Sequence, residues 1–258
     1  MIRFFYRGKK QHQKCPLGRK QIRHVLASMP TGTVIERRNR ALIAFTILSG
    51  ARDAAIASMC LKHVDIERRT VFQDAREVKT KNRKTFTSWF FPVGDDIETI
   101  VKDWITELAT LHLFGPDDPL FPSTARGLDE NQQFYASGIT RQFWSDAGPI
   151  RAIFREAFTM SGLPYFNPHS FRKTIWKLGE KVCANGAEAK AWSLNLGHEN
   201  VTTSFSSYGP MTSNERETVM GTLASRIAGK AIAALSGGNV PSPEAITQVL
   251  AYLQRTAS

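Results

Sequence analysis

The chain has 258 residues, 42% of them hydrophobic, so it can bury a sizeable core in one large domain or two small ones. Lysine and arginine outnumber aspartate and glutamate by 34 to 23, and the net charge of +11 favours a polyanionic partner, nucleic acid first, over a purely solubilising surface. There is no signal segment, no apolar run near the roughly 18 residues that span a bilayer, and an odd number of cysteines. We therefore expect a cytoplasmic or nucleoid-associated protein that makes no membrane contact.

The first fifteen residues are basic with interleaved aromatics and show no clean period, which predicts an arm or a linker. Apolar residues at helical spacing then predict one helix between residues 17 and 26 and another between 41 and 48. The second pattern stops at Gly50, as helices often do at glycine. A buried helix ending there would place Arg52 at the start of the next element.

Residues 64 to 92 are rich in β-branched and aromatic side chains and flank the polar run KTKNRK. This pattern predicts a small antiparallel β region with a basic turn. If the strand is regular, Lys79 and Lys81 point to the same face, and Arg83 and Lys84 lie deeper in the turn.

Helical patterns return at 96–111, at 139–160 with an interruption at Gly148 and Pro149, at 169–183, at 187–196 and at 213–235. Glycines and prolines between 237 and 243 then mark a linker before a short helix at 244–254. The predicted fold class is mainly α with a small antiparallel β-sheet (α+β). The predicted divisions are an arm at 1–15, one domain at 16–235, and a linker with a C-terminal helix at 236–258.

The stretch NPHSFRKT, residues 167–174, suggests a site for an anion. Pro168 favours a helix start, and residues three apart share a helical face, so His169 and Arg172 project together from the first turn. A helix N-terminus also offers backbone N–H groups and the positive end of the helix dipole. Phosphate is the anion that this arrangement fits best.

Several motifs occur in one order along the chain: Arg52 after Gly-Ala, a lysine in the predicted hairpin, HSFRKT, LGHEN with His198, and SSYGP with Tyr208 ten residues later. Together they resemble the catalytic domain of the tyrosine recombinases, the phage integrase family. The resemblance covers roughly residues 17 to 225. Each motif alone is weak, whereas their joint order is specific.

Attack of a phenol on a phosphodiester builds negative charge on the phosphoryl oxygens, and without a metal the protein must supply the compensating donors. Arg52 and Arg172 suit the two non-bridging oxygens because a guanidinium stays charged and presents a planar fork. Tyr208 would be the nucleophile; its ordinary pKa near 10 calls for a base or a cationic neighbourhood, which His169 and His198 can supply.

The resemblance implies further roles. His169 would assist proton transfer, His198 would donate to a phosphoryl oxygen, and Lys79 or Lys81 would protonate the leaving 5′-oxygen, giving a covalent 3′-phosphotyrosine. Arg83, Lys84 and Lys173 are expected to contact the DNA backbone. The implied partner is double-stranded DNA, bound by a multimer of four protomers, with neither cofactor nor metal; Cys15, Cys60 and Cys183 lack metal-ligand spacing.

The sequence departs from the family pattern at several places. Ala55 stands where an acidic residue often orients the first arginine, and Asp53 is a candidate substitute. Lys173 stands where histidine is common. The N-terminal helical domain that usually clamps the other face of DNA is expected to be absent from this chain.

Alternative interpretations remain open at this stage. The same donors would serve a type IB topoisomerase-like enzyme, and the basic surface alone would serve a catalytically silent DNA-binding regulator. Tyr6, Tyr135 and Tyr165 are the other tyrosines considered for the role of nucleophile, but only Tyr208 follows LGH at the right distance. The five tryptophans are expected in the core, and the helix with Val219, Leu223, Ile227 and Ala231 either docks on a neighbouring subunit or packs on its own domain.

Overall fold

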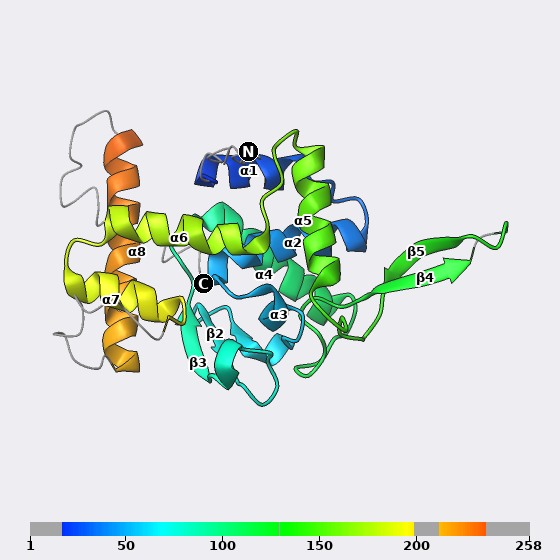
Figure 1. Ribbon diagram of the computed structural model, residues 1–258, viewed down its shortest axis with the longest axis horizontal. Coiled ribbons are helices and arrows are strands. Elements are labelled where there is room, and N and C mark those ends of the chain that lie inside the picture. Colours follow the sequence, from blue (N-terminus) through cyan, green and yellow to red (C-terminus); the bar gives the residue numbers. More distant parts are fainter. Residues whose placement is uncertain (1–16, 129, 199–211, 236–258) are drawn as a thin grey trace, which may run out of the picture.

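The computed structural model describes residues 17–128, 130–198 and 212–235, the last six of these by their backbone alone. The predicted arm at 1–15, Tyr208 and the predicted C-terminal linker and helix lie outside the described residues. Within them the fold is mainly α with small antiparallel sheets, as predicted (Figure 1).

Along the described residues, three helices come first, followed by three short strands, one helix, a pair of strands and four further helices. The helices are α1 (Arg19–Ser28), α2 (Val34–Ser49), α3 (Asp53–Ile56), α4 (Asp95–Thr110), α5 (Gly148–Met160), α6 (Pro168–Val182), α7 (Gly186–Asn195) and α8 (Ser213–Leu235). The strands are β1 (Val64–Asp65), β2 (Thr70–Gln73), β3 (Phe86–Trp89), β4 (Thr124–Leu128) and β5 (Phe134–Ile139), with 3₁₀ turns at Leu61–His63 and Lys81–Arg83.

Helix α2 lies at the centre of the core. Every residue from Ala41 to Ser49 is buried, and α1, α4, α5 and α6 pack around the helix. The Phe45 ring contacts Phe121 at 5.5 Å between centroids, which joins α2 to the segment before β4. A helix that is apolar on nearly all sides is stable only when enclosed in this way.

Both ends of α2 are fixed by local sequence. Thr33 and Glu36 form a reciprocal capping box at its start. Gly50 ends it in the left-handed conformation (φ 64°), and a Cβ there would lie 2.9 Å from Leu196. Only glycine satisfies both the backbone angle and the space, so the predicted helix end at Gly50 is confirmed.

The three-stranded sheet has the order β1-β2-β3 and is antiparallel throughout. Asn195, at the end of α7, extends it: its Oδ1 accepts from the Trp89 N–H at 2.7 Å and its Nδ2 donates to the Trp89 carbonyl at 2.8 Å. The side-chain amide thus pairs with the backbone as a further strand would. This contact holds the end of α7 against β3.

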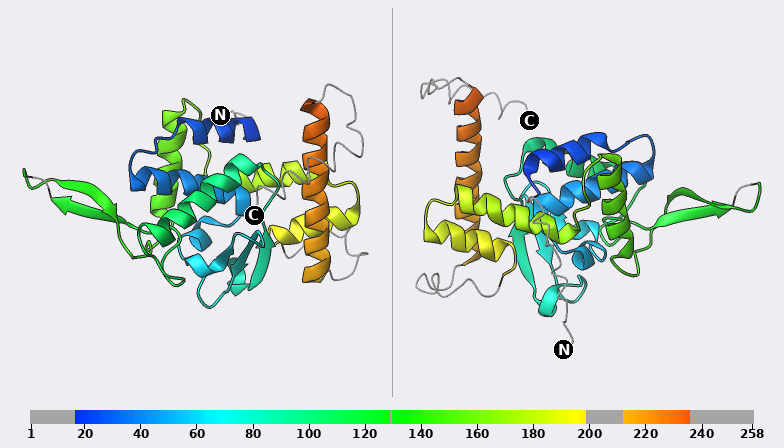
Figure 2. Two further views of the ribbon diagram at one scale, coloured as in Figure 1. Left: turned by 180° about the vertical axis from the view of Figure 1, so that it is seen from behind. Right: turned by 45° about the horizontal axis from the view of Figure 1, so that its top comes forward.

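Helix α5 begins later than predicted, and this corrects the helix expected from Ile139. Ile139 ends β5, which pairs with β4 in a two-stranded hairpin that projects from the body in every view (Figures 1 and 2). Gly148 and Pro149 begin α5, where a missing N–H costs nothing. The hairpin exposes Leu128, Phe134 and Tyr135.

Helix α8 packs on its own domain along its first half. Met220 and Leu223 are buried, and Val219 packs against the same core. The Arg226 guanidinium pairs with Glu188 of α7 at 2.6 Å. Val219 and Leu223 thus pack on their own domain, which is one of the two alternatives considered for this helix.

Candidate active site

The start of α6 forms one wall of a cavity of about 460 Å³. Asn167 caps the helix by accepting from the Ser170 N–H at 3.1 Å, and Pro168 opens the first turn, as predicted. His169 and Arg172 both line the cavity. The other lining residues are Ala51, Arg52, Asp53, Arg151, Tyr165, Asn167 and Pro168.

Arg172 is a buried cation, with 6% of the residue exposed. Its terminal nitrogens donate to the Gly50 carbonyl and, at 2.6 Å, to the Leu196 carbonyl, so it ties the end of α2 to the end of α7. Within the described ranges no carboxylate pairs with it. Burial, and then the charge of Arg52, lower its pKa to about 10, so it stays protonated at neutral pH. A buried cation without a counter-ion creates a strong preference for an anion in the cavity.

Arg52 caps the N-terminus of α3 and reaches the same cavity. Its positive charge lowers the pKa of Arg172, of His169 and of His198. These four side chains come from elements up to 146 residues apart in sequence, yet they lie within electrostatic reach of one another. The structure thus brings these four predicted donors together.

His198 lies just after the turn at Gly197, where φ is 69° and a Cβ would lie 2.8 Å from the Phe86 ring. Both features require glycine. One ring nitrogen of His198 is 3.3 Å from the Ser193 hydroxyl, and the ring lies 5.9 Å from that of Trp176. Burial, then the positive charges of Arg172, Arg52, His169 and Lys81, lower its pKa to about 4. His198 is therefore neutral at neutral pH and carries one N–H.

His169 is more exposed than His198, but its pKa is lowered as well. The causes are burial first, then the charges of Arg172, Lys173 and Arg52, which Asp53 partly opposes. A neutral imidazole can accept a proton, so the state of His169 fits a group that assists proton transfer.

The lowered pKa of His198 predicts acid sensitivity. Its folded pKa of about 4 lies below the unfolded value near 6.5, so the unfolded chain takes up the proton first. The stabilising contribution is therefore complete above pH 6.5 and is lost as the pH falls towards 4. We expect His198→Gln to flatten the fall of the thermal unfolding midpoint between pH 6.5 and 4; an unchanged pH profile would contradict the assignment.

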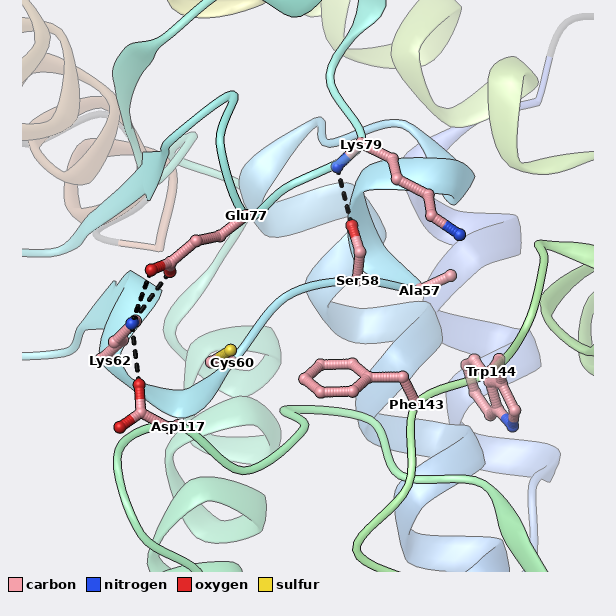
Figure 3. Close-up of a pocket in the computed structure, with 9 residues that line it drawn as sticks. All are labelled: Ala57, Ser58, Cys60, Lys62, Glu77, Lys79, Asp117, Phe143 and Trp144. Carbon is pink, nitrogen blue, oxygen red and sulfur yellow. Dashed lines mark hydrogen bonds and ion pairs between the residues drawn. The ribbon is translucent and has the colours of Figure 1, made fainter.

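The regular strand that would have placed Lys79 and Lys81 on one face is not formed, so the condition for that expectation is not met. β2 ends at Gln73 and β3 begins at Phe86, so both lysines lie in an irregular loop in which Asn82 and Arg83 have positive φ. The Lys79 ammonium donates to the Ser145 carbonyl at 3.1 Å and borders a different cavity (Figure 3). The charge of Lys81, by contrast, acts on His198.

The three residues predicted to contact DNA come from two segments of the chain. Arg83 is exposed in the 3₁₀ turn after Lys81, and Lys84 directly after it is half-buried. Lys173 is exposed next to Arg172, and its charge acts on His169. All three side chains are at least partly exposed, so a DNA backbone could approach them.

Two residues at the site, Arg151 and Trp176, were not predicted from the sequence to belong to it. Arg151, in the first turn of α5, lines the cavity and donates to Asp53 at 2.8 Å. Asp53, the candidate substitute for an acid at position 55, thus pairs with Arg151. Trp176 was expected in the core, but it is 37% exposed beside His198, so that prediction was wrong. Trp89, Trp104, Trp144 and Trp192 are buried as expected. No linear motif marks either Arg151 or Trp176.

One group of potential metal ligands occurs among the described residues: Cys60, His63 and Glu77, whose ligand atoms lie within 4.8 Å of one another. The His63 Nδ1 accepts from the Cys60 N–H at 2.8 Å, so the proton of the neutral ring is on Nε2, which faces Glu77 at 3.0 Å. Glu77 also pairs with Lys62 (Figure 3). A cation would have to displace that proton and compete with an ammonium, so the group fits an ion-pair network better than a metal site.

Comparison with known proteins decides the family. The sequence profile described as "Phage integrase family" matches residues 17–214, most of the chain. This chain belongs to the phage integrase family. No curated protein matches it.

Solved structures of integrases and recombinases share the fold. The integrase from mycobacterium phage Brujita matches with a TM-score of 0.50 and 16% identity over 84% of this chain and 60% of that one. XerA recombinase matches with a TM-score of 0.50 and 12% identity over 84% of this chain and 66% of its own. This integrase-family chain thus spans less than two thirds of the length of each of these two proteins.

Among the described residues of this chain, no helix is both long and apolar enough to cross a membrane.

Proposed function

We propose that this protein is a site-specific tyrosine recombinase that cleaves and rejoins DNA strands through a covalent 3′-phosphotyrosyl intermediate on Tyr208. The observation that carries the proposal is the cavity in which Arg52, His169 and the buried Arg172 meet, with His198 in electrostatic reach. Membership of the phage integrase family supports the same chemistry.

In the proposed mechanism a DNA phosphodiester enters the cavity and supplies an anion for Arg172, which pairs with no carboxylate among the described residues. Arg52 and Arg172 bind its non-bridging oxygens, and the neutral His198 donates its N–H to the phosphoryl group as charge develops. The Tyr208 oxygen attacks phosphorus, and His169 accepts the phenolic proton. The P–O5′ bond breaks, and Lys81 protonates the departing oxygen. A 5′-hydroxyl from another strand then reverses these steps.

Lys81 is the lysine that we assign as the general acid. Lys81→Ala should slow cleavage by about 100-fold or more, within the usual range for a positioned acid, whereas Lys79→Ala should change it by less than about threefold. A substrate with sulfur in place of the leaving 5′-oxygen should restore cleavage by Lys81→Ala, since a thiolate leaves without a proton. Equal losses in both variants would contradict the assignment.

Trapping of a covalent adduct tests the proposal. A duplex nicked just beyond the scissile phosphate loses its leaving fragment by diffusion, so the protein–DNA adduct should accumulate, with or without EDTA. A catalytically silent DNA-binding protein would bind this duplex and form no adduct. Joining of two different duplexes separates a recombinase from a topoisomerase-like enzyme, which would reseal only the duplex that it cut.

Assembly on DNA is part of the same proposal. Strand exchange requires two cleaved duplexes, so we propose that four protomers act together on double-stranded DNA, with Arg83, Lys84 and Lys173 on backbone phosphates. Sedimentation of the protein with and without duplex DNA measures the assembly. A single protomer per active complex would contradict it.

A further inference from the structure

Arg151 and Asp53 form a charge pair that lines the same cavity as the start of α6. The Arg151 Nε donates to the Asp53 Oδ2 at 2.8 Å, and 58% of the Arg151 side chain is exposed. The other carboxylate oxygen of Asp53 accepts from the Ala54 N–H at 2.9 Å. Asp53 is therefore held through both oxygens, and it fixes the guanidinium of Arg151 in turn.

The pair leaves most donors of Arg151 available. A guanidinium has five N–H groups, and Asp53 takes the one on Nε. Across the ranges that the structure covers, Asp53 is the only partner of this side chain. The two terminal nitrogens carry the remaining four N–H groups in the planar fork that suits a phosphate.

The charge balance of the cavity exceeds what one phosphodiester needs. Arg52, Arg151 and Arg172 contribute three positive charges and Asp53 one negative charge, while His169, with its lowered pKa, favours the neutral form at neutral pH. The formal charges of these four lining side chains, all within the described part of the chain, thus sum to about two positive, against one negative charge on a phosphodiester. A carboxylate would repel DNA here unless it were neutralised, and Arg151 both neutralises it and adds donors.

We propose that Arg151, positioned by Asp53, forms a second phosphate subsite that binds the backbone phosphate next to the one being cleaved. Arg151 lies in the first turn of the 13-residue helix α5. The positive end of the helix dipole is located there, which also favours a phosphate. The inference rests on the proposed function, because it takes the cavity to be the DNA site.

The slope of binding affinity against salt concentration tests the subsite directly. For a duplex of random sequence, R151Q should lower the slope of log K against log salt by about 1, the value expected for one phosphate contact, and weaken binding several-fold. R151K should keep the wild-type slope. The matched control is R23Q, which removes a similar pair, with Asp96 at 2.7 Å, away from the cavity and should leave the slope unchanged.

A double variant separates contact from neutralisation. If Arg151 only neutralised Asp53, D53N/R151Q would recover the wild-type slope and affinity, and the proposal would be wrong; a contact with phosphate keeps the slope lowered. An unchanged slope for R151Q would also overturn it, while a wild-type protein that bound no DNA would instead refute the proposed function. Since Arg151 is exposed, thermal unfolding midpoints should stay within a few degrees of wild type.

Discussion

Tyr208→Phe should abolish formation of the covalent adduct while leaving duplex affinity within about threefold. The change removes the attacking oxygen, so the protein can no longer form the covalent bond to phosphorus. It removes neither a charge nor the aromatic ring, so the affinity for duplex DNA should change little. Tyr208 lies outside the described residues, and its assignment depends on its position ten residues after His198. Adduct yield on the nicked duplex, resolved by denaturing electrophoresis, measures the effect.

Tyr165→Phe is the matched control. Of the two tyrosines that the structure describes, Tyr165 lines the cavity beside Arg52 and Arg172, whereas Tyr135 lies on the projecting hairpin. Tyr165 is thus the phenol best placed to replace Tyr208 as nucleophile. Its variant should keep nearly full adduct yield. Retained cleavage by Tyr208→Phe together with loss in Tyr165→Phe would transfer the role to Tyr165.

Arg172→Ala should lower the rate of adduct formation by two orders of magnitude or more. Loss of one preorganised donor to the transition state costs on the order of 3 kcal/mol, which corresponds to such a factor. The variant should also be less stable, because the Gly50 and Leu196 carbonyls lose their partner at a cost of about 1–3 kcal/mol each. Rates are therefore compared well below the unfolding midpoint.

Arg38→Ala separates catalysis from stability. Arg38 is as buried as Arg172, donates to the Pro122 carbonyl at 2.8 Å and to the Thr124 hydroxyl at 3.0 Å, and does not line the cavity. Burial lowers its pKa to about 10, as it does for Arg172. We expect a comparable loss of stability with a rate within a few-fold of wild type. Equal rate losses in the two variants would mean that Arg172 acts only through folding.

The helices that carry the site were predictable because local chemistry specifies their ends. Gly50 stops α2 for reasons of backbone angle and space, and Pro168 after Asn167 starts α6. These two signals fix where Arg52 and Arg172 emerge. The roles predicted for His169, His198 and the hairpin lysine came from the resemblance to the family.

The features that were missed depend on tertiary contacts. The β4–β5 hairpin has only two strands and exposes its apolar residues, so its pattern did not show the strict alternation of a half-buried sheet. The choice between Lys79 and Lys81 depends on the positive φ of Asn82 and Arg83 and on the Ser145 carbonyl. Arg151 reaches the site because α5 packs against α1 and α2, which brings its first turn to Asp53 of α3.

The position of the covalent bond tests the central claim most directly. Wild-type protein trapped on the nicked duplex in EDTA, digested with protease and nuclease and analysed by tandem mass spectrometry, should yield a nucleotide linked through phosphate to the phenolic oxygen of Tyr208. Attachment to another residue, or cleavage that requires a divalent metal and leaves no adduct, would contradict the account.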